Sequence, residues 1–101
     1  QSVDAALPTV QAATCPSGTV PTIMTTNLTD AFQPNTLTIT AGQIVKFTMS
    51  STHNVVPNPL ANTDSGLKVN FNETKCLKFT KAGTFGFQCM PHGFGGSVTV
   101  Q

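Results

Sequence analysis

Arginine, tyrosine and tryptophan do not occur in this chain of 101 residues, and glutamate occurs only once, as Glu73. Five lysines and four acidic residues leave a net charge of +1, and charged residues make up only 9% of the chain. A nucleic-acid-binding domain carries a clustered excess of basic residues, so this composition excludes that class. No apolar stretch approaches the roughly 20 residues that a membrane-spanning helix needs, so we expect no membrane span.

Cysteine is scarce, and the three cysteines are unevenly placed. Cys15 and Cys76 stand far apart with no metal-binding residue beside them, whereas His92 follows Cys89 by three residues. An odd cysteine count favours one disulfide and one thiol with another role, so we expect Cys15 and Cys76 to be bonded. The alternative is three free thiols in a cytosolic protein. A disulfide in so small a domain implies an oxidising compartment, so we expect a periplasmic or extracellular protein.

The first 18 residues differ in pattern from the rest of the chain. Residues 1–13 show no sustained hydrophobic period and carry one charge. We therefore expect residues 1–18 to be a flexible segment, stapled by the disulfide and a candidate tether, with the folded domain spanning residues 19–101.

Period-two alternation of apolar residues recurs along residues 36–100, with glycine turns at Gly42 and Gly83 and no helical stretch of useful length. Alternation of this kind marks half-buried strands. The pattern predicts six to eight short strands, an all-β chain, and an antiparallel sandwich or barrel. The alternating sets are Leu37 and Ile39; Val45, Phe47 and Met49; Leu67, Val69 and Phe71; Leu77 and Phe79; Phe85, Phe87 and Cys89; and Val98 and Val100.

The same alternation assigns the cysteines to faces. Cys89 shares its parity with Phe85 and Phe87, which predicts that its thiol points into the core. Cys76 shares its parity with Lys78, which predicts an outward side chain to which the N-terminal segment is fastened.

The two histidines follow predicted strands. His53 comes directly after the strand that ends near Ser50, and His92 comes after the strand that ends at Cys89. Adjacent strand ends of one sandwich meet at the same pole, so we expect His53, Cys89 and His92 to lie together. One thiolate and two imidazoles are the ligand set of a trigonal copper site.

From Ala31 onwards the sequence resembles the cupredoxins, the small type 1 blue copper proteins. "FQPNTLTITAGQIVKFTMSSTHNVV" is similar to their strand, turn and strand before the first copper histidine and its following Asn. "KAGTFGFQCMPHGF" is similar to their glycine turn, aromatic strand and copper loop, with the Cys-x-Pro-His order of plastocyanin, pseudoazurin and the short-looped amicyanin. The resemblance implies a two-sheet Greek-key β-sandwich, one copper ion that alternates between Cu⁺ and Cu²⁺, and electron transfer rather than enzymatic activity.

The resemblance also implies a role for each matching residue. His53 and His92 match the two imidazole ligands and Cys89 matches the thiolate. Asn54 matches the Asn that ties the two ligand loops together, and groups of that sort fix the orientation of the ligands. Redox partners are expected to dock transiently around His92, on an apolar rim that comprises Pro91, Gly93, Phe94 and Leu60, and the protein is expected to be a monomer.

The chain departs from the family at the axial ligand. Cupredoxins usually carry a Met a few residues after the second His, but here His92 is followed by Gly93-Phe94-Gly95-Gly96. We therefore expect Phe94, a backbone carbonyl or water on the axis. A Phe94 shield would raise the reduction potential, and an axial water would lower it. We favour the shield because Phe94 is the only bulky side chain in this loop.

Three alternatives remain open. The first is a module that handles or senses copper through an open coordination position. The second is a copper enzyme, which needs small-molecule binding at the metal. The third is a zinc site with water as the fourth ligand.

Overall fold

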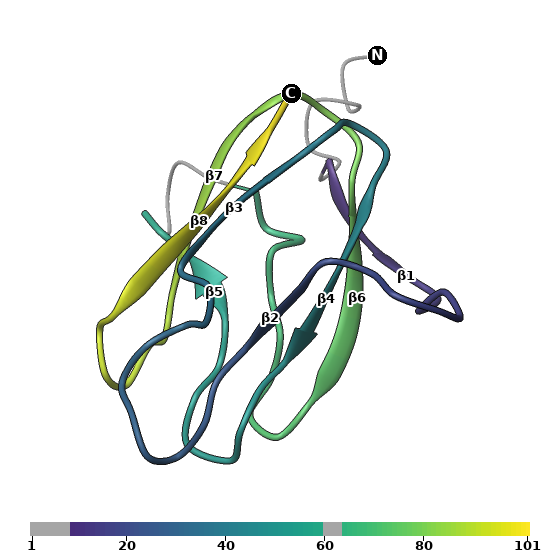
Figure 1. Cartoon of the computed structure of the whole chain (residues 1–101). Coiled ribbons are helices and arrows are strands. Elements are labelled where there is room, and N and C mark those ends of the chain that lie inside the picture. Colours follow the sequence, from purple (N-terminus) through teal and green to yellow (C-terminus); the bar gives the residue numbers. More distant parts are fainter. Residues whose placement is uncertain (1–8, 60–63) are drawn as a thin grey trace.

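The computed structural model describes residues 9–59 and 64–101, which form eight strands in two four-stranded sheets (Figure 1). One sheet has the order β1-β6-β4-β2 and the other the order β3-β8-β7-β5. The all-β sandwich is therefore confirmed. Within the described ranges no helix has the length and apolarity that crossing a membrane requires. The strands are β1 (Val10–Ala13), β2 (Thr22–Met24), β3 (Thr36–Ile39), β4 (Ile44–Thr48), β5 (Val56–Pro57), β6 (Thr74–Phe79), β7 (Gly83–Gln88) and β8 (Gly95–Val100).

The strand pairing is mixed, not wholly antiparallel as the sequence suggested. β2 runs parallel to β4, and β3 runs parallel to β8, while the other neighbours are antiparallel. Parallel neighbours cannot be joined by a tight hairpin, and the chain passes from one sheet to the other at every connection from β2 to β7. These crossings bring the loops after β2, β4 and β7 to one end of the sandwich, at the bottom of Figure 1 and away from the C-terminus.

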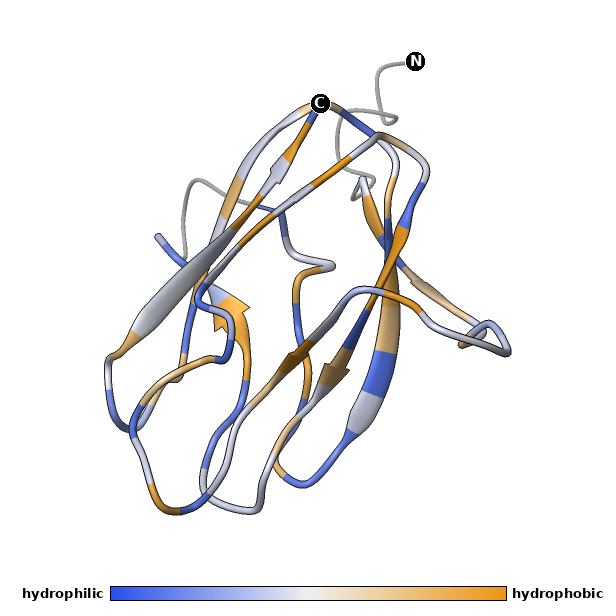
Figure 2. Cartoon of the chain, in the orientation of Figure 1, coloured by the Kyte–Doolittle hydropathy of each residue, from blue (hydrophilic) through white to orange (hydrophobic). Residues whose placement is uncertain are grey.

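Phenylalanine supplies the aromatic packing between the sheets. The Phe87 ring lies 4.7 Å from that of Phe32 and 5.7 Å from that of Phe47, in edge-to-face contacts. Full burial of each such ring is worth about 1.5–3 kcal/mol. In Figure 2 apolar residues recur along the strands, while the connections are largely polar. The buried apolar residues are Val10, Ile23, Phe32, Ile39, Val45, Phe47, Met49, Val55, Leu67, Val69, Leu77, Phe79, Phe87, Cys89, Val98 and Val100.

Two segments differ from their sequence-based expectation. Val10–Ala13 lie in the segment expected to be flexible, yet they form β1, an edge strand antiparallel to β6. Leu67 and Val69 are buried as their alternation implied, but among the described residues their strand-like pairing is limited to a single bridge between Val69 and Val55. Phe71 is 46% exposed, so the alternation does not continue to it. The division of the chain at residues 18 and 19 stays a prediction.

The disulfide between Cys15 and Cys76 is present, with Cα atoms 5.2 Å apart. Cys76 pairs with Lys46 of β4 and alternates with the core residue Leu77, so it lies on the outer face of its sheet as predicted. It is nevertheless only 1% exposed, because the bonded Cys15 and its segment lie over it. The staple therefore fastens the N-terminal segment to the outside of the sandwich.

Asp64 fastens the start of β1 from the other side. Its Oδ2 accepts hydrogen bonds from the backbone N–H and hydroxyl of Thr9 and the N–H of Val10, and its Oδ1 accepts one from the N–H of Gly66. Burial would raise the pKa of Asp64, but these hydrogen bonds together outweigh burial and hold its pKa below the usual value. A Cβ at Gly66 would collide with the Val10 carbonyl oxygen, so the loop approaches β1 closely only with glycine here.

We predict that Asp64→Asn lowers the free energy of unfolding at pH 7 by about 1–2 kcal/mol, because four hydrogen bonds lose their charged acceptor. A depressed folded-state pKa gives a contribution that is fully present above the unfolded pKa of about 3.9 and is lost as the pH falls through the folded-state pKa. Urea unfolding at pH 7 and about pH 2.5 should therefore show the difference from wild type shrinking in acid. Asp30→Asn, at a side chain that is 66% exposed, is the control. A difference that does not depend on pH would contradict this role for Asp64.

Candidate metal centre

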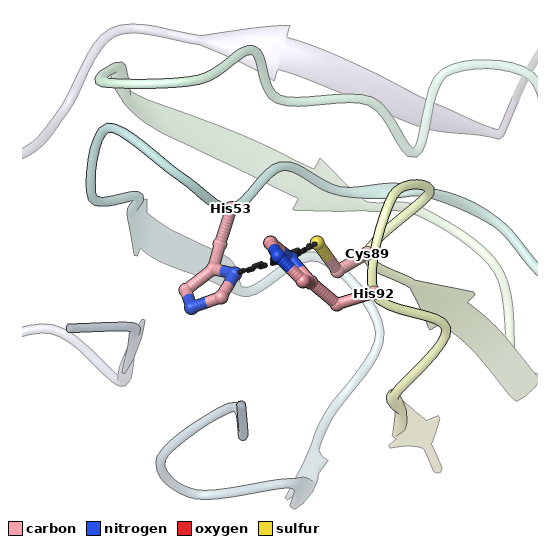
Figure 3. A group of neighbouring side chains, drawn as sticks. All are labelled: His53, Cys89 and His92. Carbon is pink, nitrogen blue, oxygen red and sulfur yellow. Dashed lines mark hydrogen bonds between the residues drawn. The ribbon is translucent and has the colours of Figure 1, made fainter. Parts of the chain in front are cut away.

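Three potential metal ligands converge at the end of the sandwich where the β4–β5 and β7–β8 loops meet. His53 follows β4, Cys89 directly follows β7, and His92 lies in the loop before β8. Figure 3 shows the three side chains pointing toward one another. His53 and Cys89 are buried while His92 is exposed, which confirms the inward direction expected for Cys89.

The donor atoms form a nearly equilateral triangle. The two Nδ1 atoms of His53 and His92 are 3.2 Å apart, and Cys89 Sγ lies 3.6 Å and 3.5 Å from them, respectively. A point equidistant from these atoms lies about 2.0 Å from each, which compares with about 2.0–2.1 Å for a zinc–nitrogen bond and 2.3 Å for a zinc–sulfur bond. The triangle therefore fits a first-row metal ion, and its mixture of one thiolate with two imidazoles suits copper.

The far nitrogen of His53 fixes which nitrogen faces this point. His53 Nε2 lies 2.9 Å from the carbonyl oxygen of Thr29, and a carbonyl can only accept a hydrogen bond. Nε2 therefore carries the proton, and Nδ1 presents its lone pair to Cys89 and His92. A carboxylate oxygen of Asp30 lies 3.8 Å from the same Nε2. Partners of this kind hold a ligating imidazole in orientation.

The loop that carries the other two potential ligands, Cys89 and His92, is closed by backbone hydrogen bonds. The Cys89 N–H donates to the Phe94 carbonyl at 2.9 Å, and the Gly93 N–H donates to the Cys89 carbonyl at 2.7 Å. Gly93 has a φ of 77°, a conformation that favours glycine. Asn54 joins this loop to that of His53, because its Oδ1 accepts a hydrogen bond from the Met90 N–H at 2.9 Å.

Phe94 lies beside both imidazoles. Its ring centroid is 4.9 Å from that of His53, 6.4 Å from that of His92 and 4.8 Å from that of Phe32. The ring is half-buried and packs against the core. Of the rim residues named from the sequence, Leu60 lies outside the described residues, while Pro91 and Gly93 are exposed next to His92.

The β2–β3 loop contributes to the site in a way that the sequence did not reveal. Thr29 contacts His53 through a backbone carbonyl, which any residue could supply, and Asp30 is one acidic residue in a polar stretch. Neither has a periodic pattern or a motif that could have revealed it.

A β-sandwich that brings a thiolate and two imidazoles together at one end is the architecture of a cupredoxin-like copper protein. The sequence model described as copper binding proteins, plastocyanin/azurin family, matches residues 22–101. The chain belongs to this family, and its cofactor is one copper ion.

Solved structures of amicyanin share the fold. One oxidised amicyanin variant superposes with a TM-score of 0.74 at 19% identity, and a second variant in its Cu(I) form with 0.73 at 20%; each match covers 92% of this chain and 99% of that chain. A reduced variant gives 0.69 at 21% identity with the same coverage. At such identities the likeness shows the fold alone. No curated protein matches the sequence significantly.

Proposed function

We propose that His53, Cys89 and His92 hold the copper ion and that the protein carries single electrons between redox partners outside the cytoplasm. The observation that carries the proposal is the triangle of donor atoms, with sides of 3.2–3.6 Å, provided by two loops of a rigid sandwich. Bound copper supplies a one-electron couple between Cu⁺ and Cu²⁺.

The protein's own residues limit movement during that exchange. His53 is held by the Thr29 carbonyl, and the Cys89 backbone is held by the Phe94 carbonyl. Asn54 ties the two ligand loops together. A site that keeps one geometry in both oxidation states spends little free energy on rearrangement, which suits a carrier better than a protein that must take up and release its metal.

The exposed His92 is the proposed route for electrons. Its ring reaches the surface beside Pro91 and Gly93, whereas His53 and Cys89 are buried. We propose that partners dock transiently on this rim and on the accessible part of Phe94, with a small interface, and that the carrier is a monomer and not an enzyme. The Cys15–Cys76 disulfide supports a periplasmic or extracellular location, with the N-terminal segment as a candidate tether.

The alternative function is a module that handles or senses copper through an open coordination position. The ligand loop favours it in one respect, because Gly93-Phe94-Gly95-Gly96 offers no side-chain donor for the axis. A copper enzyme would need the same opening and small-molecule binding at the metal. The position of Phe94 against both imidazoles supports the shielded site of a carrier.

We predict that Cys89→Ser abolishes the intense visible absorption of the copper-loaded protein, because that absorption arises from the copper–thiolate bond, while the sandwich still folds. The absorption spectrum and circular dichroism measure the two properties. Met90→Leu, at the exposed neighbouring residue, is the matched control and should keep the colour. Colour that survives in Cys89→Ser would overturn the ligand assignment, and a colourless wild type loaded with Cu²⁺ would overturn the trigonal site itself.

The second prediction separates the carrier from the handling module. Because the ligands are held in place, voltammetry should give a reversible one-electron wave and nuclear magnetic resonance should show fast self-exchange between the two oxidation states. Removal of copper by a chelator should be much slower than this electron exchange. Sluggish electron exchange together with rapid copper release would favour the handling module.

The third prediction concerns the axis. If Phe94 shields the copper, electron paramagnetic resonance should show a small copper hyperfine splitting. Phe94→Gly should then enlarge the splitting and lower the reduction potential, because water can enter and favours Cu²⁺. Each 1.4 kcal/mol of added stabilisation of the Cu²⁺ state lowers the potential of a one-electron couple by about 59 mV. Phe94→Leu, which keeps an apolar side chain, should stay close to wild type. A large splitting in the wild type would show water on the axis. A spectroscopic signal of a methionine sulfur bound to copper that disappears in Met90→Leu would refute both the shielded and the water-bound site.

A further inference from the structure

The loop between β2 and β3 reaches across the end of the sandwich to the turn that carries His53. Its base is closed by two backbone hydrogen bonds between Met24 and Gln33, of 3.0 Å and 2.9 Å. The hydroxyl of the buried Thr25 accepts a hydrogen bond from the Ser50 N–H at 2.9 Å. The hydroxyls of Thr25 and Ser50 form another hydrogen bond at 3.0 Å. The loop is therefore anchored at both ends, and the segment between the anchors lies against the residues before His53.

Asn27 makes the contacts in the middle of this loop. Its Nδ2 donates to the Ser51 hydroxyl at 2.8 Å. Its Oδ1 accepts from the Thr52 hydroxyl at 2.8 Å and from the Thr52 N–H at 3.3 Å. One amide side chain thus uses both its donor and its acceptor to hold the two residues that directly precede His53.

The same loop also holds the His53 ring. The Thr29 carbonyl, two residues after Asn27, accepts the hydrogen bond from His53 Nε2 at 2.9 Å. The distance between this carbonyl and the His53 backbone depends on how firmly the loop is fastened to the turn. Asn27 supplies that fastening, so it lies between the two points that orient the imidazole.

We propose that Asn27 is a positioning residue for the copper ligand His53, acting through Ser51, Thr52 and the Thr29 carbonyl. It fixes the spacing between the His53 turn and the carbonyl that keeps the proton on Nε2. The proposal rests on the proposed role of His53 as a copper ligand. Asn27 is exposed, so its hydrogen bonds contribute little to global stability and their main effect is local geometry.

Asn27→Ala tests the proposal in the Cu(I)-loaded protein. Loss of the three contacts should make copper release to a chelator about tenfold faster, the lower end of the range by which loss of such partners weakens metal binding. It should also speed the exchange of the His53 Nε2 proton with solvent. The urea unfolding midpoint should stay near that of wild type. Nuclear magnetic resonance measures the exchange of the Nε2 proton. Copper release is measured on samples that are reoxidised after set times, as the loss of the copper–thiolate absorption.

Two further variants complete the experiment. Asn27→Asp should restore most of the wild-type behaviour, because its carboxylate still accepts from Thr52 and the Ser51 hydroxyl can turn to donate. Leu28→Ala changes the next residue, which is 93% exposed, and should have no effect. The proposal is overturned if Asn27→Ala behaves like Leu28→Ala, or if both rates rise only as much as the loss of global stability accounts for. A wild type without the thiolate colour would instead overturn the proposed function.

Discussion

The buried imidazole of His53 is the constraint on which the proposed copper site depends. With 1% of its surface exposed, the ring cannot rely on water for either nitrogen, so both need partners inside the protein. The Thr29 carbonyl satisfies Nε2, which leaves the lone pair of Nδ1 to face Cys89 and His92. Two converging imidazole lone pairs and a thiol suit a cation at their centre, and this burial therefore supports the proposed copper site.

The aromatic core packs against the His53 ring and holds it in position. Phe94 packs on His53 and on Phe32, and Phe32 packs on Phe87, so an unbroken series of ring contacts joins the ligand to the middle of the sandwich. Close-packed rings resist displacement, and they surround the ligand with apolar atoms in which nearby charges act strongly. The Asp30 carboxylate lies 3.8 Å from His53 Nε2, but 66% of its side chain is exposed, so water screens its charge.

Much of this structure could be predicted from the sequence, because alternation records which side chains face the core. The strands around Phe47 and Phe87, the inward Cys89 and the outward Cys76 all follow from parity. The parallel pairs could not be foreseen, since pairing depends on how the sheets stack, and β1 was missed because Val10 is its only fully buried residue. Loop contacts such as that of Asn27 use hydrogen bonds between residues far apart in the sequence, and these leave no periodic signal.

The ligands are held to different degrees, and this asymmetry bears on function. His53 is held by the hydrogen bond from its Nε2 to the Thr29 carbonyl and by its aromatic neighbours, and Cys89 is buried at the end of β7. His92 stands in a short loop with its ring at the surface. If these residues hold the copper as proposed, the two buried side chains would keep its geometry constant, and the exposed imidazole of His92 would give a partner access while Cys89 stays away from solvent. The proposed carrier needs both properties in one site, and burial of His53 and Cys89 together with exposure of His92 would supply them.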